Sequence, residues 1–137
     1  MRVMGLDIGM KHIGVAVSDE SGTIAQGRGV VERRTDRDAV SRIKELADEY
    51  GVKEIVVGFP INMNGTVGER GRDSEVLAEK IKEATGLNVV LWDERLTTRG
   101  AESVLISADV SRRKRKKVVD KIAAQLILQE YLDSMEK

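Results

Sequence analysis

The sequence has no cysteine, a single proline, a single histidine and only four aromatic residues, and its formal net charge is zero. The absence of cysteine excludes disulfides and thiolate-bound zinc. So few aromatic side chains exclude the exposed base-stacking sheet that many single-strand binders use. The longest apolar runs are far shorter than a bilayer span, so we expect no membrane partner and a cytoplasmic protein. A chain of 137 residues suits one domain, and we expect residues 1–137 to form it.

Charge is unevenly distributed along the chain, although it sums to zero. Residues 111–137 carry a net charge of +4, and residues 1–110 carry −4. The excess comes from six consecutive bases, Arg112, Arg113, Lys114, Arg115, Lys116 and Lys117. Such a run can be an ordinary solvated surface, but just before a helix N-terminus it opposes the helix dipole. We therefore expect a mobile loop that holds nucleic-acid phosphates, with binding that weakens steeply as salt rises.

Apolar periodicity predicts an α/β fold. Short turns separate the first three strands, near 2–8, 13–18 and 23–31, so these strands should be antiparallel neighbours. The later elements are expected in the order helix 36–50, strand 54–59, helix 69–85, strand 88–93, helix 97–108 and helix 118–135. This order predicts a mixed five-stranded sheet, an antiparallel three-strand meander followed by parallel strands, flanked by helices.

Three carboxylates stand out of place in this pattern. Asp7 lies near the end of the first apolar strand, and Asp120 shares a stripe of the last helix with small and apolar residues. At the end of the fifth strand, Asp93 and Glu94 would point to opposite faces, and alternation alone does not select one. Each acid also has an ordinary explanation, as a turn cap, a solvated strand end or a favourable helix N-terminal charge. Because the carboxyl ends of strands carry the sites of α/β folds, we expect the acids to meet there.

A carboxylate inside an apolar strand needs a partner, because burying it unpaired costs several kcal/mol or shifts its pKa. With one histidine in the chain, a histidine-rich metal site is unavailable, whereas carboxylate oxygens suit a hard ion such as Mg²⁺ or Mn²⁺. Such ions clamp phosphates and activate water for phosphodiester cleavage. The acids therefore predict a metal-dependent hydrolase of nucleic acid.

Four segments together resemble the YqgF family. They are G-L-D-I-G-M-K-H-I-G-V-A-V-S-D at 5–19, V-G-F-P-I-N-M-N-G-T at 57–66, D-E-R-L-T-T at 93–98 and V-D-K-I-A-A-Q-L-I-L-Q-E-Y-L at 119–132. The resemblance covers nearly the whole chain in the expected order. It implies a ribonuclease H-like fold and a nuclease that either matures the 5′ end of precursor 16S ribosomal RNA or resolves Holliday junctions. It also implies that Asp7, Glu94 and Asp120 are the catalytic, metal-binding acids, which selects Glu94 over Asp93.

Other residues near these acids are candidate contacts to nucleic acid. We expect Lys11, Arg95 and the run 112–117 to hold backbone phosphates. His12 stands where the family often has arginine, and Asn64 stands where an aspartate is common. For His12, a phosphate or leaving-group contact beside Asp7 competes with a solvent-exposed turn residue, and we favour the exposed turn.

These observations favour a metal-dependent endonuclease acting on structured precursor ribosomal RNA, with the ribosome or its precursors as partners. The oligomeric state is left open between monomer and homodimer. A four-way DNA junction is the alternative substrate, and its symmetric cutting would require a dimer with two sites. A non-catalytic RNA-binding factor for ribosome assembly also remains open. A nucleotide-binding regulator is a further alternative, because D-I-G-M-K-H-I-G-V-A resembles the first phosphate loop of actin-like ATPases.

Overall fold

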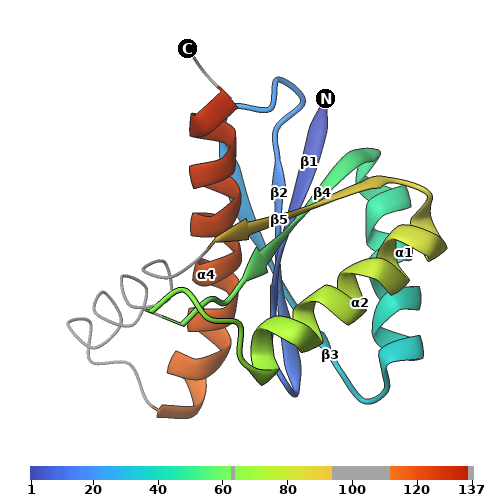
Figure 1. Cartoon of the computed structure of the whole chain (residues 1–137). Helices are drawn as coiled ribbons and strands as arrows, with labels where there is room; N and C mark the ends of the chain where they lie inside the picture. Colours follow the sequence, from blue (N-terminus) through green and yellow to red (C-terminus); the bar gives the residue numbers. More distant parts are fainter. Residues whose placement is uncertain (63, 94–111, 136–137) are drawn as a thin grey trace.

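The computed structural model describes residues 1–62, 64–93 and 112–135, with the backbone alone for 112–120 (Figure 1). The elements are β1 (Arg2–Ile8), β2 (His12–Ser18), β3 (Ala25–Glu32), α1 (Asp36–Tyr50), β4 (Val52–Phe59), α2 (Glu69–Thr85), β5 (Asn88–Asp93) and α4 (Arg112–Met135). Within these ranges, no helix has an apolar stretch long enough to cross a bilayer.

The five strands form one mixed sheet in the order β3-β2-β1-β4-β5. Strands β1, β2 and β3 pair antiparallel, whereas β4 pairs parallel to β1 and β5 parallel to β4. Figure 1 shows α1 and α2 on one face of the sheet and α4 on the other. The predicted antiparallel meander followed by parallel strands is therefore confirmed, and β1 lies at the centre, covered on both faces.

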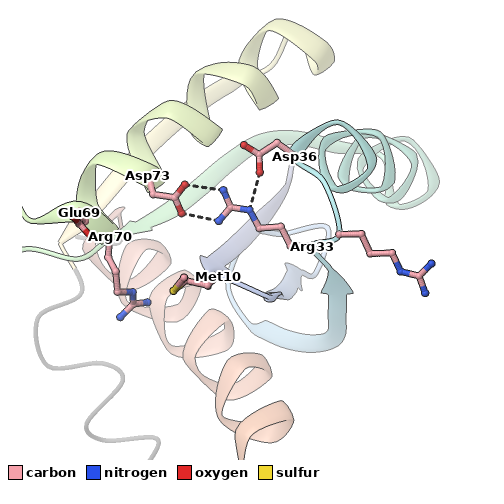
Figure 2. Close-up of a pocket in the computed structure, with 7 residues that line it drawn as sticks. Met10, Arg33, Asp36, Glu69, Arg70 and Asp73 are labelled. Atoms are coloured by element: carbon pink, nitrogen blue, oxygen red, sulfur yellow. Dashed lines mark hydrogen bonds and ion pairs between the residues drawn. The ribbon is translucent and has the colours of Figure 1, made fainter.

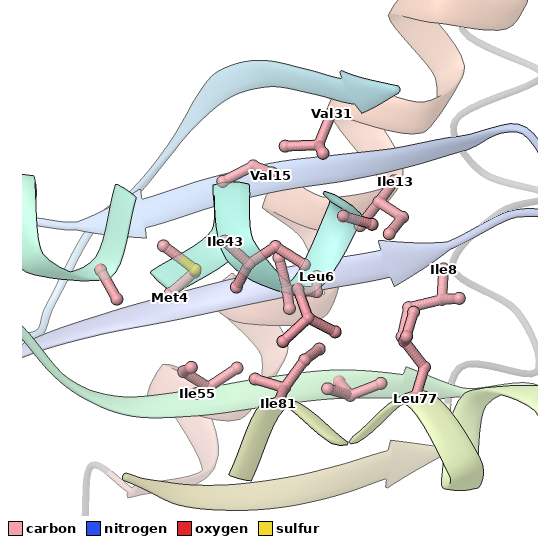
Figure 3. Packing of buried hydrophobic residues seen from close by; sticks show 14 of the residues in the cluster. Met4, Leu6, Ile8, Ile13, Val15, Val31, Ile43, Ile55, Leu77 and Ile81 are labelled. Carbon is pink, nitrogen blue, oxygen red and sulfur yellow. The ribbon is translucent and has the colours of Figure 1, made fainter. Parts of the chain in front are cut away.

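Each face of the sheet has its own apolar core, because side chains alternate along every strand. The core under α1 and α2 is the larger one (Figure 3), and its fully buried side chains include Met4, Leu6, Ile13, Ile43, Ile55, Leu77 and Ile81. The core under α4 includes Val3, Ala16, Val56, Ala124, Ile127, Leu128 and Tyr131. Odd-numbered residues of β1 therefore face α4, and even-numbered residues face α1 and α2.

The first two helices end where the sequence predicts. Thr35 caps α1 by accepting a hydrogen bond from the Asp38 backbone N–H at 3.1 Å. Gly51 and Gly86 follow α1 and α2 in the left-handed conformation, with φ of 66° and 70°. Glycine adopts that conformation without a steric penalty, so these two positions stop their helices and return the chain to the sheet.

The last helix differs from the prediction at its start. It begins at Arg112, six residues before the expected residue 118. The expected loop at 112–117 is therefore wrong, because these six bases form the start of α4 instead. The expected helix 97–108 lies outside the described residues.

Helix α4 packs directly against the backbone of β1 at Gly5. A methyl group built on Gly5 would lie 2.7 Å from Leu128 Cβ and 3.0 Å from the Ala124 carbonyl oxygen. Both distances are shorter than ordinary contacts, so glycine is needed for this approach. Asp7 is two residues further along β1 on the same face, and the height of α4 above Asp7 therefore depends on Gly5.

Replacing Gly5 with alanine should destabilise the protein by about 1–3 kcal/mol, because the new methyl group has no space against the α4 backbone. Urea unfolding measures the change. Gly27→Ala is the matched control on the same face, since its methyl group meets the exposed side chains of Lys121 and Gln125 and no backbone atom, and these side chains can move aside. An equal loss in both variants would contradict this account of Gly5.

Candidate active site at the end of strand β1

Asp7 is the next-to-last residue of β1 and is only 5% exposed. It shares the α4 face with Val3 and Gly5, while its neighbours Leu6 and Ile8 are buried in the opposite core. A carboxylate in such surroundings loses most of its hydration, which favours bound partners that compensate its charge. The fold therefore places Asp7 near the carboxyl end of the central strand, as the sequence predicts.

Helix α4 runs antiparallel to β1, so its beginning lies toward Asp7. Gln129 Oε1 accepts a hydrogen bond from the Ala25 N–H at 2.9 Å, and Gln125 Oε1 accepts one from the Gly27 N–H at 3.2 Å. Ala25 pairs with Ser18 and Gly27 with Ala16, which in turn pairs with Gly5. The residues of α4 that lie nearer to its start therefore lie nearer to the Asp7 end of β1.

Asp120 is one helical turn before Ala124, the residue whose carbonyl lies against Gly5. Its backbone therefore belongs to the part of α4 that extends toward the Asp7 end of β1. The side chain of Asp120 is outside the described set. Its predicted role beside Asp7 stays a prediction that the helix direction makes geometrically reasonable.

The register of β5 settles which of its last residues shares a face with Asp7. Trp92 pairs with Gly58 and packs edge-to-face on Tyr131 of α4, with ring centroids 5.6 Å apart. Trp92 is therefore on the α4 face, and Asp93 belongs to the opposite face. Strand alternation therefore excludes Asp93 from the α4 face that carries Asp7, whereas Glu94, together with Arg95, lies outside the described residues.

A metal ion fits this end of the sheet through Asp7, whose carboxylate oxygens are ligands that Mg²⁺ and Mn²⁺ prefer. Among side chains in the described ranges, no three that commonly bind metals form a cluster able to hold an ion. Of the three predicted ligands, Asp7 is the one whose side chain the structure describes.

The turn from β1 to β2 carries Lys11 and His12 at the same end of the sheet. Lys11 is exposed, as a residue that binds phosphates should be. His12 is not the solvent-exposed turn residue that we favoured. It is the first residue of β2, it is partly buried, and its backbone oxygen accepts a hydrogen bond from the Gly9 N–H at 2.9 Å.

An ion-pair cluster around Arg33 is hydrogen-bonded to this turn (Figure 2). Two guanidinium nitrogens donate to the Asp73 carboxylate at 2.6 and 2.7 Å, and Nε donates to Asp36 at 2.9 Å. Arg33 also donates from its side chain to the Gly9 carbonyl at 3.0 Å and from its backbone to the Lys11 carbonyl at 2.8 Å. Only 9% of its side chain is exposed.

The Arg33 cluster is charged at neutral pH. Hydrogen bonds from the Arg33 guanidinium lower the pKa of Asp73, and they also lower the pKa of Asp36. The Asp73 carboxylate in turn raises the pKa of Arg33 above its ordinary value. These bonds join the turn after Asp7 to the first turns of α1 and α2. The sequence could not reveal the cluster, because Arg33 and Asp73 are 40 residues apart.

A shallow cavity of about 360 Å³ lies beside the cluster. Its lining residues are Met10, Arg33, Arg34, Asp36, Glu69, Arg70 and Asp73. Arg34 is exposed and ion-paired with Glu32 at 3.3 Å. The positive and negative side chains in the lining are equal in number, so the cavity itself has no net charge that would attract an anion.

The model of the RuvX family, described as Holliday junction resolvase, matches residues 1–134. The chain belongs to the RuvX family. This confirms the resemblance seen in the sequence, since RuvX and YqgF denote the same family. A RuvX relative from Geobacillus kaustophilus, named "Putative pre-16S rRNA nuclease", is 57% identical over 136 residues, or 98% of this chain and 99% of the relative.

Two solved structures show the same fold as this RuvX chain. The fowlpox virus Holliday junction resolvase has a TM-score of 0.60 at 14% identity and covers 99% of this chain and 100% of its own. Thermus thermophilus RuvC in complex with a Holliday junction substrate has a TM-score of 0.53 at 18% identity, covering 98% and 96%. The ribonuclease H-like fold is therefore confirmed. Membership of the RuvX family, whose relatives are named as nucleases, confirms the prediction of a phosphodiester-cleaving hydrolase.

Replacing Arg33 with methionine should destabilise RuvX by about 1–3 kcal/mol, because Asp73 and the Gly9 carbonyl lose a largely buried donor. Urea unfolding at neutral pH measures the loss. Arg34→Met is the matched control, because Arg34 is its exposed neighbour and an exposed substitution should change stability by less than about 0.5 kcal/mol.

Arg33→Met should also change how the stability of the protein depends on pH in acid. Because the folded pKa values of Asp36 and Asp73 are lowered, their stabilising contribution is present above their unfolded pKa and is lost as pH falls through the folded pKa. Unfolding midpoints measured from pH 6 down to about pH 2 should therefore fall less steeply in Arg33→Met than in wild type. Parallel pH profiles would show that the cluster does not couple to these two protons.

Proposed function

We propose that this RuvX chain is a metal-dependent endonuclease that processes the 5′ end of precursor 16S ribosomal RNA. The observation that carries the proposal is the buried Asp7, at the carboxyl end of the central strand, facing the part of α4 that leads to Asp120. The relatives named for this substrate, of which the Geobacillus protein is one, support the choice of RNA. A cytoplasmic location belongs to the same proposal, because ribosomal precursors are made in that compartment.

The proposed ligands of one or two Mg²⁺ or Mn²⁺ ions are Asp7, Glu94 and Asp120. Asp7 supports this assignment because its carboxylate is fixed by a central strand and shielded from bulk water. The exclusion of Asp93 by the register of β5 supports Glu94. When bound, the metal would stabilise the negative charge that develops on the scissile phosphate.

The remaining residues of the proposed site hold the nucleic acid. Lys11 extends from the turn that directly follows Asp7, and the start of α4 adds the six bases at 112–117 ahead of Asp120. Arg95, next to Glu94 in sequence, is the third proposed phosphate contact. Positive charge would thus come from three segments around one acidic centre, and backbone phosphates would position the strand for cleavage.

The description of the family model favours a second candidate, resolution of Holliday junctions. The same three acids would serve, but a four-way junction presents two strands for symmetric cutting. Two sites related by a two-fold axis, and therefore a homodimer, would then be required. Cleavage of precursor RNA makes no such demand, and a monomer would suffice.

Asp7→Asn should abolish cleavage while RNA binding and the unfolding midpoint are largely retained. The amide keeps the shape of the side chain but removes the charge that a divalent ion requires. Cleavage of precursor 16S RNA and of a synthetic four-way DNA junction should be measured side by side, with Mg²⁺, with Mn²⁺ and with EDTA.

Cleavage of the RNA alone would support the leading candidate, and cleavage of the junction by a dimer would support the second. EDTA should stop either reaction in the wild type. Full activity of Asp7→Asn, or full activity in EDTA, would overturn the proposed site.

Lys114→Gln combined with Lys116→Gln should weaken RNA binding at low salt and flatten its salt dependence. Each lost phosphate contact should reduce the slope of log K against log salt by about 0.7–0.9. Lys44→Gln combined with Lys82→Gln is the matched control, because these exposed lysines lie on α1 and α2 over the opposite face. Fluorescence anisotropy in EDTA measures binding without cleavage. Equal slopes in the two double variants would contradict a role for the basic run.

A further inference from the structure

His12, the only histidine of the chain, shares a face with Asp7. Asp7 pairs with Gly14 of β2, and Ile8 pairs with Ile13. Ile13 is buried in the core under α1 and α2, so His12 and Gly14 point to the α4 face, as Asp7 does. His12 and Asp7 are thus diagonal neighbours on adjacent antiparallel strands. Residues in that relation are typically about 7–8 Å apart on their backbones, a separation that long side chains can bridge.

The imidazole of His12 is not held by polar contacts in the way that a structural histidine usually is. Its Nδ1 is buried and has no hydrogen-bond partner within the part of the chain that the structure describes. A buried polar atom without a partner costs about 1–3 kcal/mol, so stability alone does not account for a histidine here. The residue as a whole is only partly buried, so it is not sealed inside the apolar core.

Glu32, the acid that pairs with His12 on the neighbouring strand, has another charged partner. His12 pairs with Glu32 of β3, and the Glu32 carboxylate is ion-paired with Arg34 at 3.3 Å. The backbone of His12 is fixed by the Gly9 hydrogen bond, whereas its Nδ1 has no hydrogen-bond partner among the described residues. Turning the ring toward a ligand therefore breaks no bond to Nδ1, and a hydrogen bond from Nδ1 to that ligand would remove the cost of burying it.

We propose that His12 is a substrate-contacting residue of the nuclease site. Its imidazole donates a hydrogen bond to a non-bridging phosphate oxygen of the nucleic-acid strand beside Asp7. This inference rests on the proposed function, because it places the strand at the Asp7 end of the sheet. Lys11, immediately before His12, supplies a charge to the same stretch of backbone, and His12 supplies direction through a hydrogen bond.

His12→Phe tests the proposal, because phenylalanine keeps a planar ring and removes both nitrogens. The unfolding midpoint should stay the same or rise, since no polar atom is left buried, whereas kcat/KM should fall about 10- to 100-fold, as expected for one hydrogen bond to a charged group. His12→Asn, whose amide N–H stands near the position of Nδ1, should recover part of that loss. A lower midpoint with unchanged kcat/KM would assign His12 a structural role and overturn the proposal.

A direct measurement uses the fact that the chain has one histidine. In untagged protein with ¹⁵N-labelled histidine, the imidazole gives a single set of NMR signals. These signals should shift when an oligonucleotide covering the 5′ end of precursor 16S RNA is added in EDTA, where no cleavage occurs. Unchanged signals at saturating RNA, and likewise at saturating four-way DNA junction, would overturn the contact.

The two experiments separate this inference from the proposed function. If wild type cleaves, Asp7→Asn does not and His12→Phe cleaves like wild type, the His12 contact is wrong and the nuclease site stands. If wild type cleaves neither substrate, the proposed function fails, and the NMR titration still decides whether His12 touches nucleic acid.

Discussion

The contact between Gly5 and helix α4 controls the geometry of the candidate site. At this point the helix lies against the backbone of the central strand, and a methyl group would meet Leu128 Cβ at 2.7 Å. The helix direction, fixed by the bonds of Gln125 and Gln129 to the backbone of β3, carries its early residues toward Asp7. A small residue in a central strand therefore sets how closely the backbone of α4 can approach the strand that carries Asp7.

The two faces of the sheet differ in the residues that they carry. The face under α1 and α2 carries the larger apolar core, and at its edge Arg33 ties the turn after Asp7 to the first turns of both helices. The α4 face carries Asp7 and, by the pairing of β1 with β2, His12. Arg33 thus fixes the turn between these strands from the face of α1 and α2, whereas Asp7 and His12 lie on the face of α4. The hydrogen bond of Arg33 to the Gly9 carbonyl connects the cluster to the turn that begins two residues after Asp7.

Much of this arrangement follows from the sequence, because it depends on local pattern. Alternation and short turns predict the meander, and Gly51 and Gly86 mark helix ends that the structure contains. Asp7 is recognisable as a carboxylate inside an apolar strand. Alternation alone could not choose between Asp93 and Glu94, and the family resemblance made that choice. The pairing of β5 and the contact of Trp92 with Tyr131 add that Asp93 lies on the face opposite Asp7.

Three features could not be obtained from local pattern. The ion pair of Arg33 with Asp73 joins distant segments, and no periodicity reports such a contact. The sequence favours an exposed turn for His12, because the pairing with Glu32 of β3 that makes it part of β2 joins residues 20 positions apart. The start of α4 was placed too late because six identical charges show no apolar periodicity, and the dipole argument counts against a helix there.

That early start has an energetic consequence. Within the first turns of α4, Arg112 stands four residues from Lys116 and Arg113 four from Lys117, and like charges at this spacing repel by about 0.2–0.5 kcal/mol per pair. Six bases in succession therefore disfavour helix formation in this segment, and the phosphates of a bound nucleic acid would reduce that repulsion. Under the proposed function, nucleic-acid binding and formation of the first turns of α4 would be thermodynamically linked, because each bound phosphate would reduce repulsion between bases of the same helix.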